Sequence, residues 1–219
     1  MAYGANMKRM NPCSDALVLQ LIGEYCPAPG AMLDAGCGRG DRLTVLAEGL
    51  PDTALYGLDV DWENAMAARR HCPTAEIVTG GMEVLPWDTA LFGAILCECT
   101  LSLTETPERC LREFRRVLRP GGVLLLSDLC LPGSGESVEL PGSGGVRRLF
   151  TREWVEKSAA SAGFFLVKYL DCREDLLAMA AQMILDGSFC RCVDAGTANA
   201  LKNYRAGYGL WVLEKEVVR

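Results

Sequence analysis

The amino-acid sequence predicts an α/β fold built on a mostly parallel sheet. Short runs of strand-forming residues alternate with longer amphipathic segments, a pattern typical of parallel strands joined by helices. A glycine run follows the first of these short runs directly and leads into a helical segment. Residues 90–97 are almost wholly apolar, as expected of a central strand that is buried on both faces.

The first expected helix begins after Ser14, whose hydroxyl can cap it, and continues to about residue 25. Pro27, Pro29 and Gly30 then break the chain. The expected strands are residues 31–35, 54–58, 76–79, 90–97, 123–127, 164–170 and 210–216. The later expected helices are residues 41–49, 63–72, 107–118, 151–162 and 175–185. Residues 186–207 carry an ambiguous pattern.

The composition fits an ordinary soluble globular protein of 219 residues, of which 50% are apolar and 23% charged. No segment approaches the roughly 20 apolar residues that span a bilayer. Residues 1–12 also lack the apolar core of a signal peptide. We therefore expect a cytoplasmic protein without a membrane partner, present as a monomer or a homodimer.

The net charge is −6, and the basic residues are dispersed along the chain. The densest group lies on one expected amphipathic helix, where a solvated face is a better interpretation than a nucleic-acid site. This group is Arg112, Arg115, Arg116 and Arg119. We therefore expect no nucleic-acid partner.

Eleven cysteines are many for a chain of this length, and the number is odd. Reduced thiols in a cytosolic protein are the natural interpretation. Free cysteine is a common small residue in protein cores, and we expect this role for Cys26, Cys110 and Cys130. The functional question is whether some of the other thiols meet in space.

The glycine run DAGCGRG at residues 34–40 joins an expected strand to an expected helix. Its glycines allow a sharp turn and the close approach of a ligand, and the helix start offers free N–H groups. A dinucleotide fingerprint would place a third glycine at position 41, where Asp41 stands instead. Together with Asp34, this acid favours a ligand that carries a cationic or amino group.

Asp59 ends the next expected strand. A carboxylate at that place can accept hydrogen bonds from two ribose hydroxyls. An isolated aspartate at a strand end is more often a helix cap or a turn former. The glycine run at the expected distance favours the ribose role.

Four segments in order resemble the motifs of class I S-adenosylmethionine-dependent methyltransferases, type 11-like, over about residues 32–128. These segments are residues 33–40, 56–60, 80–87 and 118–124. The resemblance implies a methyltransferase with S-adenosyl-L-methionine as its cofactor. It also implies a Rossmann-like three-layer αβα sandwich, with a seven-stranded, mostly parallel sheet that contains one antiparallel strand.

The resemblance also assigns roles by position. Asp34 and the glycine backbone would hold the methionine part of the cofactor, Asp59 the ribose, and Val60 and the backbone of Met82 the adenine. Many relatives carry Asp where Gly81 stands, and that Asp accepts a hydrogen bond from the adenine amino group. The absence of this acid here either weakens cofactor affinity or shifts the contact with the amino group to Glu83. The expected cofactor-binding residues are Asp34, Gly36, Cys37, Gly38, Asp59, Val60, Gly81, Met82 and Cys97.

The acceptor side is expected at the end of the fourth strand, where Cys97 and Cys99 stand. Cys190 and Cys192 lie in the variable C-terminal segment, and thiols that converge suit a soft, thiophilic ligand. Residues 99–103 also show a partial resemblance to arsenite methyltransferases, without the N-terminal cysteine pair. We therefore expect a small-molecule acceptor, with a thiol or a thiophilic metalloid as one option and core packing of the cysteines as the alternative.

The family has no universal catalytic residue, because methyl transfer chiefly needs alignment of the nucleophile with the methyl group. Candidates for a catalytic role are Cys99, Glu98 and Asp128, although capping or solvation also explains the two acids. Two Cys-x-Cys pairs do not have the spacing of a structural zinc site, so we expect no metal. His71 is expected at the surface. The aromatic residues near the C-terminus are expected in the core: Tyr204, Tyr208 and Trp211.

We expect residues 1–219 to form a single methyltransferase domain. Residues 1–30 would carry the N-terminal helix, and residues 171–208 would form an insertion that covers the acceptor site. Residues 131–145 contain two Pro, five Gly and three Ser, which predicts a flexible loop, either a lid or a surface excursion. The alternative function is a thiol-rich metal-binding or redox-sensing protein that retains the fold.

Overall fold

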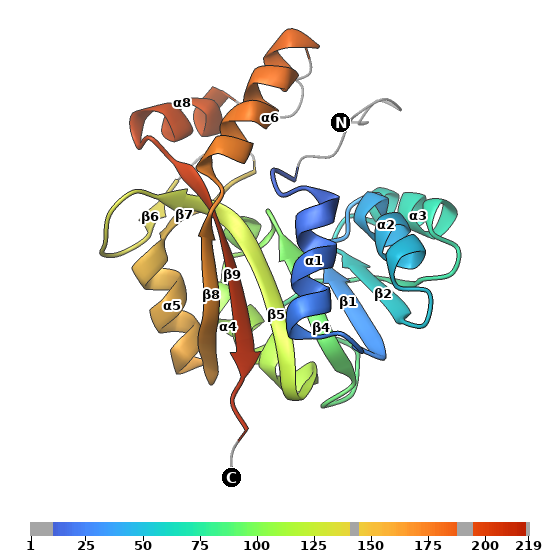
Figure 1. Ribbon diagram of the computed structural model, residues 1–219. Helices are drawn as coiled ribbons and strands as arrows, with labels where there is room; N and C mark the ends of the chain where they lie inside the picture. The colour runs from blue at the N-terminus through green and yellow to red at the C-terminus, as the bar shows by residue number, and fades with distance from the viewer. Residues whose placement is uncertain (1–10, 141–144, 188–194, 218–219) are drawn as a thin grey trace.

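The computed structural model describes residues 11–140, 145–187 and 195–217. Within these residues the chain forms an α/β structure in three layers (Figure 1). The helices are α1 (Asp15–Tyr25), α2 (Asp41–Gly49), α3 (Trp62–His71), the short 3-10 helix η1 (Leu101–Leu103), α4 (Pro107–Val117), α5 (Arg152–Ser161), α6 (Arg173–Leu185) and α8 (Ala195–Asn203). The strands are β1 (Ala31–Ala35), β2 (Ala54–Asp59), β3 (Glu76–Thr79), β4 (Phe92–Glu98), β5 (Leu118–Leu131), β6 (Val138–Glu139), β7 (Arg148–Thr151), β8 (Phe164–Asp171) and β9 (Gly207–Lys215).

The main sheet has the order β3-β2-β1-β4-β5, and all of these strands are parallel. β9 continues the sheet antiparallel to β5, and β8 pairs antiparallel with β9 at the edge. The predicted fold class and the mainly parallel sheet are therefore confirmed. The expected number of seven strands is wrong, because the described residues form nine.

Of the two additional strands, β6 lies within residues 131–145, which the sequence predicted as a loop, and β7 follows them. β7 pairs in parallel with the end of β5, and the two-residue strand β6 pairs antiparallel with β7. β5 itself runs to Leu131, so the predicted loop begins later than expected. Residues 141–144 lie outside the described residues.

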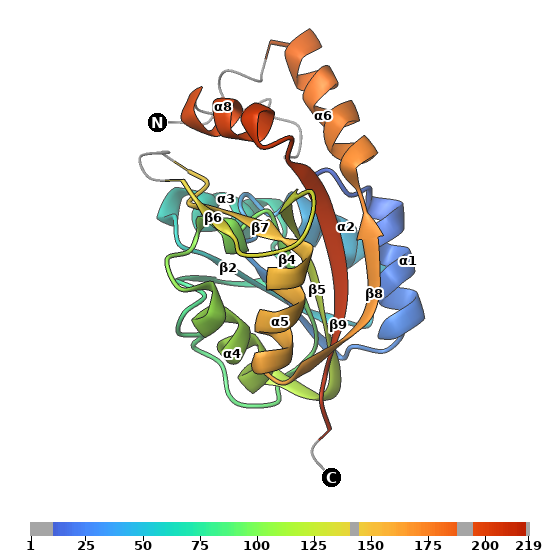
Figure 2. The same ribbon diagram turned by 90° about the vertical axis from the view of Figure 1, so that its left-hand side faces the viewer.

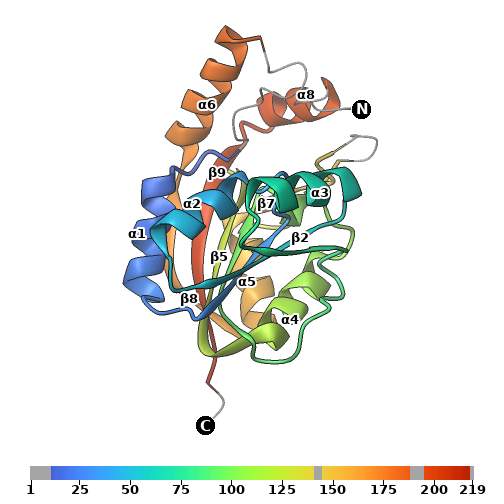
Figure 3. The same ribbon diagram turned by 90° about the vertical axis from the view of Figure 1, so that its right-hand side faces the viewer.

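Each face of the sheet carries its own helices and its own apolar cluster. α1, α2 and α3 cover one face, and α4 and α5 cover the other (Figures 2 and 3). Cys26, Cys110 and Cys130 are buried in these clusters, as predicted. The prediction for Tyr208 and Trp211 is also confirmed, since both are fully buried.

Two further predictions concern residues near helix ends. Ser14 caps α1 as expected, because its hydroxyl accepts the N–H of Leu17 at 3.2 Å. His71 is exposed, also as expected. The prediction for Tyr204 is wrong: its side chain is 45% exposed just after α8.

α6 and α8 lie beyond the carboxyl ends of the parallel strands, over the end of the sheet that carries the glycine turn (Figure 1). α8 falls in the segment whose pattern was ambiguous in the sequence. Among the described helices, none is both long and apolar enough to cross a bilayer.

Candidate cofactor and acceptor site

The glycine run forms the tight turn between β1 and α2. Gly36, Gly38 and Gly40 have φ values of +85°, +53° and +86°, which L-residues with a side chain rarely adopt. The N–H groups of Gly36 and Cys37 donate to the carbonyl of Leu58 at 2.7 and 2.9 Å. These bonds fasten the turn to the end of β2.

The first two glycines differ in what surrounds them. A Cβ at Gly36 would lie 2.4 Å from the methyl group of Thr100, so this glycine is required by packing within the protein. A Cβ at Gly38 would meet no protein atom within 4 Å. The open side of the turn is therefore at Gly38, where a ligand can approach the backbone.

Asp59 lies directly beside this open side. Its Oδ2 accepts the N–H of Gly38 at 2.8 Å, and its Oδ1 accepts the N–H of Asp61 at 2.9 Å. The neighbouring Asp61, not Asp59, caps α3 by accepting the N–H groups of Glu63 and Asn64. The helix-cap alternative for Asp59 therefore does not explain its position. We call Asp34, Gly36, Gly38 and Asp59 the glycine-turn site.

The segment after β3 is tied to the same place. The N–H of Gly80 donates to the carbonyl of Asp59 at 2.9 Å. The Oε2 atom of Glu83 lies 2.7 Å from the position that a Cβ on Gly81 would occupy. Glu83 thus places a carboxylate where the family's usual acid would begin. Val60, next to Asp59, is 79% exposed, and Met82 is buried.

Asp34 is buried at the end of β1. Loss of hydration raises the pKa of its carboxyl to about 8, and the negative charges of Glu98 and Asp59 act in the same direction. The positive charge of Arg42 opposes this shift. A buried carboxylate near other carboxylates destabilises the ligand-free protein, but it is suited to contact with a cationic ligand.

Glu98, at the end of β4, is held in a buried ion pair with Arg42. Arg42 Nε and Nη2 donate to the two carboxylate oxygens at 2.7 and 3.0 Å, and the side chains of both residues are 3% exposed. Asn11 Nδ2 donates to Glu98 Oε2 at 3.0 Å. Arg42 also binds the carbonyl of Cys13 at 2.9 Å and the carboxylate of Asp15. This bidentate pair gives Glu98 a structural role and leaves its carboxylate poorly placed to accept a proton from a substrate.

Asp128, the other acidic candidate, is fully buried in β5. Its oxygens accept the N–H groups of Ser102 and Leu129, both at 2.8 Å, so it holds η1 against β5. Burial raises the pKa of its carboxyl to about 6. These bonds favour a positioning role for Asp128 over direct contact with an acceptor.

The thiols of Cys97 and Cys99 have different surroundings. Cys97 is fully buried in the cluster below α4, and its Sγ lies 3.2 Å from Thr100 Oγ1. Cys99 is half-buried against the opposite cluster, and its Sγ lies 2.9 Å from Tyr208 Oη. Cys99 has φ +55°, which ends the regular alternation of the strand.

The expected convergence of thiols is thus not seen for Cys97 and Cys99. Cys190 and Cys192 lie outside the described residues. Among the residues that the structure describes, there is no group of three or more side chains that could hold a metal ion.

Three side-chain contacts near the site were not predicted from the sequence. Thr100 Oγ1 donates to the carbonyl of Ala35 at 3.0 Å and so joins β4 to the glycine turn. Arg42 holds Glu98, and the buried Tyr208 hydroxyl links Cys99 to Ser127 Oγ, to which it donates at 2.9 Å. These contacts join residues far apart in sequence, so no local pattern reveals them.

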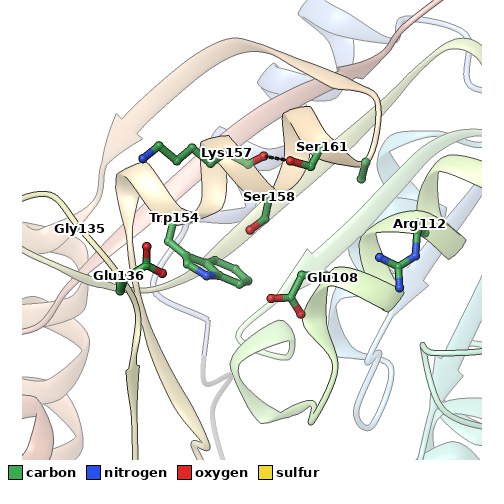
Figure 4. Close-up of a pocket in the computed structure, with 9 residues that line it drawn as sticks. Glu108, Arg112, Gly135, Glu136, Trp154, Lys157, Ser158 and Ser161 are labelled. Carbon is green, nitrogen blue, oxygen red and sulfur yellow. Dashed lines mark hydrogen bonds between the residues drawn. The ribbon is translucent and has the colours of Figure 1, made fainter.

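Two hollows lie elsewhere, along α4 and α5. One, of about 280 Å³, is lined by residues of mixed charge that include Glu108, Arg112 and Lys157 (Figure 4). The other, of about 540 Å³, is lined by Arg112, Arg115 and Lys215 among others. Neither contains a residue of the glycine-turn site, so we do not assign the cofactor to them.

The order of the main sheet and the glycine turn at the carboxyl end of β1 define a Rossmann-like fold with a ligand site at the strand ends. The family model described as a methyltransferase domain matches residues 33–126. This region is therefore a class I S-adenosylmethionine-dependent methyltransferase domain, and S-adenosyl-L-methionine is the cofactor of that class.

Curated relatives are similar over part of their length. A malonyl-(acyl-carrier protein) O-methyltransferase of Methylococcus capsulatus is 31% identical over 157 residues, which are 67% of this chain and 56% of that protein. A demethylmenaquinone methyltransferase of Chlorobaculum tepidum is 30% identical over 113 residues, which are 52% of this chain and 45% of that protein. The chain thus spans about half the length of these relatives.

Solved structures extend the similarity of fold to nearly the whole chain. The geranyl diphosphate C-methyltransferase of Streptomyces coelicolor, solved with S-adenosyl-L-homocysteine, has a TM-score of 0.72 at 16% identity, covering 91% of this chain and 77% of that one. The cyclase SpnF has a TM-score of 0.70 at 23% identity, covering 93% and 82%. At these identities the likeness concerns the fold alone.

Proposed function

We propose that this protein transfers the methyl group of S-adenosyl-L-methionine to a small-molecule acceptor. The observation that carries the proposal is the glycine-turn site, where an open left-handed turn at Gly38 adjoins the two buried acids Asp34 and Asp59. A ligand with an ammonium group, a sulfonium centre and a ribose complements such a site. Direct titration with S-adenosyl-L-methionine tests it, and no binding at millimolar concentration would refute it.

Each part of the cofactor has a proposed partner. Asp34 faces the ammonium group, whose positive charge offsets the cost of its buried carboxylate. Asp59 accepts the ribose hydroxyls, because a carboxylate has about four acceptor positions and two of them hold the N–H groups of Gly38 and Asp61. Glu83 takes the contact with the adenine amino group that an acid at position 81 makes in many relatives.

The change Asp59→Ala is expected to weaken binding of both S-adenosyl-L-methionine and S-adenosyl-L-homocysteine by about 1–3 kcal/mol, since it leaves hydrogen bonds to a charged group unmade. Isothermal titration measures the loss. Asp61→Ala is the matched control, because it removes the cap of α3 in the same turn and should leave affinity unchanged. Equal affinities for Asp59→Ala and the parent protein would exclude the ribose role.

The change Gly38→Ala is expected to lower cofactor affinity at least tenfold while costing about 1–2 kcal/mol of stability, the penalty of a left-handed residue. The added methyl group meets no protein atom and would occupy the space of the ligand. Gly133→Ala is the control, since Gly133 also has a positive φ and open surroundings but lies in the loop after β5. Titration and urea denaturation of both variants separate the two effects; unchanged affinity in Gly38→Ala would contradict the approach of the ligand there.

For the acceptor, we propose that α6 and α8, which lie beyond the strand ends, cover the site beside Cys99. Burial keeps the pKa of the Cys99 thiol high, which disfavours the thiolate that a thiophilic metalloid requires. A thiol or metalloid acceptor would therefore depend on Cys99 together with thiols outside the described residues. Turnover with arsenite that is lost in Cys99→Ser would support that acceptor, and turnover only with carboxyl, hydroxyl or carbon acceptors would exclude it.

A further inference from the structure

Two buried cysteines from distant parts of the chain face each other near the acceptor side. Cys13 lies just before α1, and Cys172 lies between β8 and α6, 159 residues later. Their sulfur atoms are 3.9 Å apart, and each residue is 3% exposed. Within the described part of the chain, no second pair of thiols is hydrogen-bonded in this way.

The two sulfur atoms are chemically unequal. The thiol of Cys13 donates a hydrogen bond to the sulfur of Cys172, and this bond lowers the pKa of Cys172. Burial raises the pKa of most other cysteines, including Cys97, Cys99 and Cys110. Cys172 is therefore the more readily ionised partner, and thiolates are the form that reacts with oxidants.

We propose that Cys13 and Cys172 form a reversible disulfide site that fastens the N-terminal segment to the start of α6 when a peroxide is present. The Cys172 thiolate attacks hydrogen peroxide, which gives a sulfenic acid and hydroxide. Cys13 then attacks the sulfenic sulfur, the S–S bond forms, and one water molecule leaves. In total two thiols lose two electrons and two protons, and the peroxide is reduced to two water molecules.

Contacts of the pair explain why its oxidation would affect the acceptor side. The carbonyl of Cys13 accepts from Arg42, which holds Glu98 at the end of β4. The N–H of Cys172 donates to the carbonyl of Tyr208 at 2.8 Å, and the hydroxyl of Tyr208 contacts Cys99. A disulfide would thus restrict both the N-terminal segment and the base of α6 around the proposed acceptor position.

The chemistry of this site is independent of the proposed methyl transfer, whereas its regulatory effect rests on that function. In the reduced protein the N-terminal segment and the start of α6 are joined at this point by noncovalent contacts alone, a weak thiol hydrogen bond and apolar packing, so the segment can separate. In the oxidised protein it cannot, so entry or release of the acceptor is expected to slow several-fold. Cofactor affinity is expected to stay within about twofold, because neither cysteine belongs to the glycine-turn site.

The test uses the full chain treated with stoichiometric hydrogen peroxide, followed by blocking of free thiols in denaturant and non-reducing peptide mapping. We expect one cross-linked pair of peptides that carries Cys13 and Cys172, lost in Cys13→Ser and in Cys172→Ser and retained in Cys26→Ser, a buried control in the same N-terminal region. The melting temperature should rise on oxidation of the parent protein, and dithiothreitol should reverse the rise.

The disulfide site, its regulatory effect and the proposed function are refuted by different results. Linkage of Cys172 to another cysteine, or its conversion to sulfinic acid without a cross-link, would refute the disulfide site. A cross-link with unchanged turnover would refute its regulatory effect while leaving the site in place. Absence of cofactor binding in the reduced protein would refute the proposed function and not the disulfide, since the peptide map does not depend on activity.

Discussion

Replacing Arg42 by methionine is expected to lower the free energy of unfolding by about 3–5 kcal/mol, because it removes the positive charge that compensates the buried Glu98 carboxylate. The side chains of Arg42 and Glu98 are both 3% exposed, and Asp34 lies close enough for its carboxylate to repel that of Glu98. The N-terminal segment would also lose its bond to Arg42 at Cys13. Urea denaturation at pH 7 measures the loss.

Two further variants test the cause. The double change Arg42→Met with Glu98→Leu should recover most of the stability, since an apolar pair of similar volume carries no charge to desolvate. Lys157→Met, which breaks the exposed pair with Glu153, should cost no more than about 1 kcal/mol. A loss below about 1 kcal/mol in Arg42→Met, or a double variant as unstable as the single one, would show that the pair is not the source of stability.

Much of the fold could be predicted because its signals are local. The strand at 31–35 and the helix at 41–49 have the bounds that the sequence indicated, since apolar residues and glycines mark both ends. The strands β6 and β7 were missed, because β6 has only two residues within a segment rich in Gly, Ser and Pro, and β7, just after that segment, has only four, which are too few to show a periodicity. Their pairing with the end of β5 is a tertiary contact.

The site was predictable where a motif fixes the backbone and less so where distant residues meet. The glycine turn and Asp59 lie together as expected, because consecutive parallel strands end at the same edge. The sequence places Cys97 and Cys99 together at the end of the fourth strand, but their side chains pack against opposite apolar clusters, and Cys99 has a positive φ just after β4. Neither that backbone conformation nor the partner Tyr208, 109 residues away, has a signature in the local sequence.

These contacts give the glycine-turn site an unusual balance of charge. Asp34, Asp59 and Glu98 lie close together, and Arg42 is a cation that offsets them within the protein. Arg42 is paired with Glu98, so the ionised form of Asp34 remains disfavoured by burial and by the neighbouring negative charges. In the ligand-free protein the Asp34 carboxyl binds a proton, and in the complex the positive charge of a ligand can take the place of that proton. Stability and cofactor binding are therefore opposed at Asp34.

Replacing Asp34 by asparagine is accordingly expected to stabilise the ligand-free protein and to weaken cofactor binding. The folded pKa of about 8 lies above the value of 3.8 for an exposed carboxyl, so between these values the folded protein keeps a proton that the unfolded chain has released. Stability then falls as the pH rises, by up to about 1.4 kcal/mol per pH unit, and levels off above a pH of about 8. The amide of the Asp34→Asn variant does not titrate and gives no such slope, so the advantage of this variant should grow from about pH 5 to about pH 8.

Urea denaturation of both proteins at pH 5, 6, 7 and 8 measures this growing difference, and Asp128→Asn provides the comparison. The pKa of Asp128 is about 6, so the advantage of that variant should stop growing above pH 6 and stay constant from pH 7 to pH 8. Saturating S-adenosyl-L-methionine should flatten the slope of the parent protein, because the ligand's positive charge favours the Asp34 carboxylate. A pH-independent difference between Asp34→Asn and the parent would mean that Asp34 is already ionised without ligand, and its burial would then need another compensating charge.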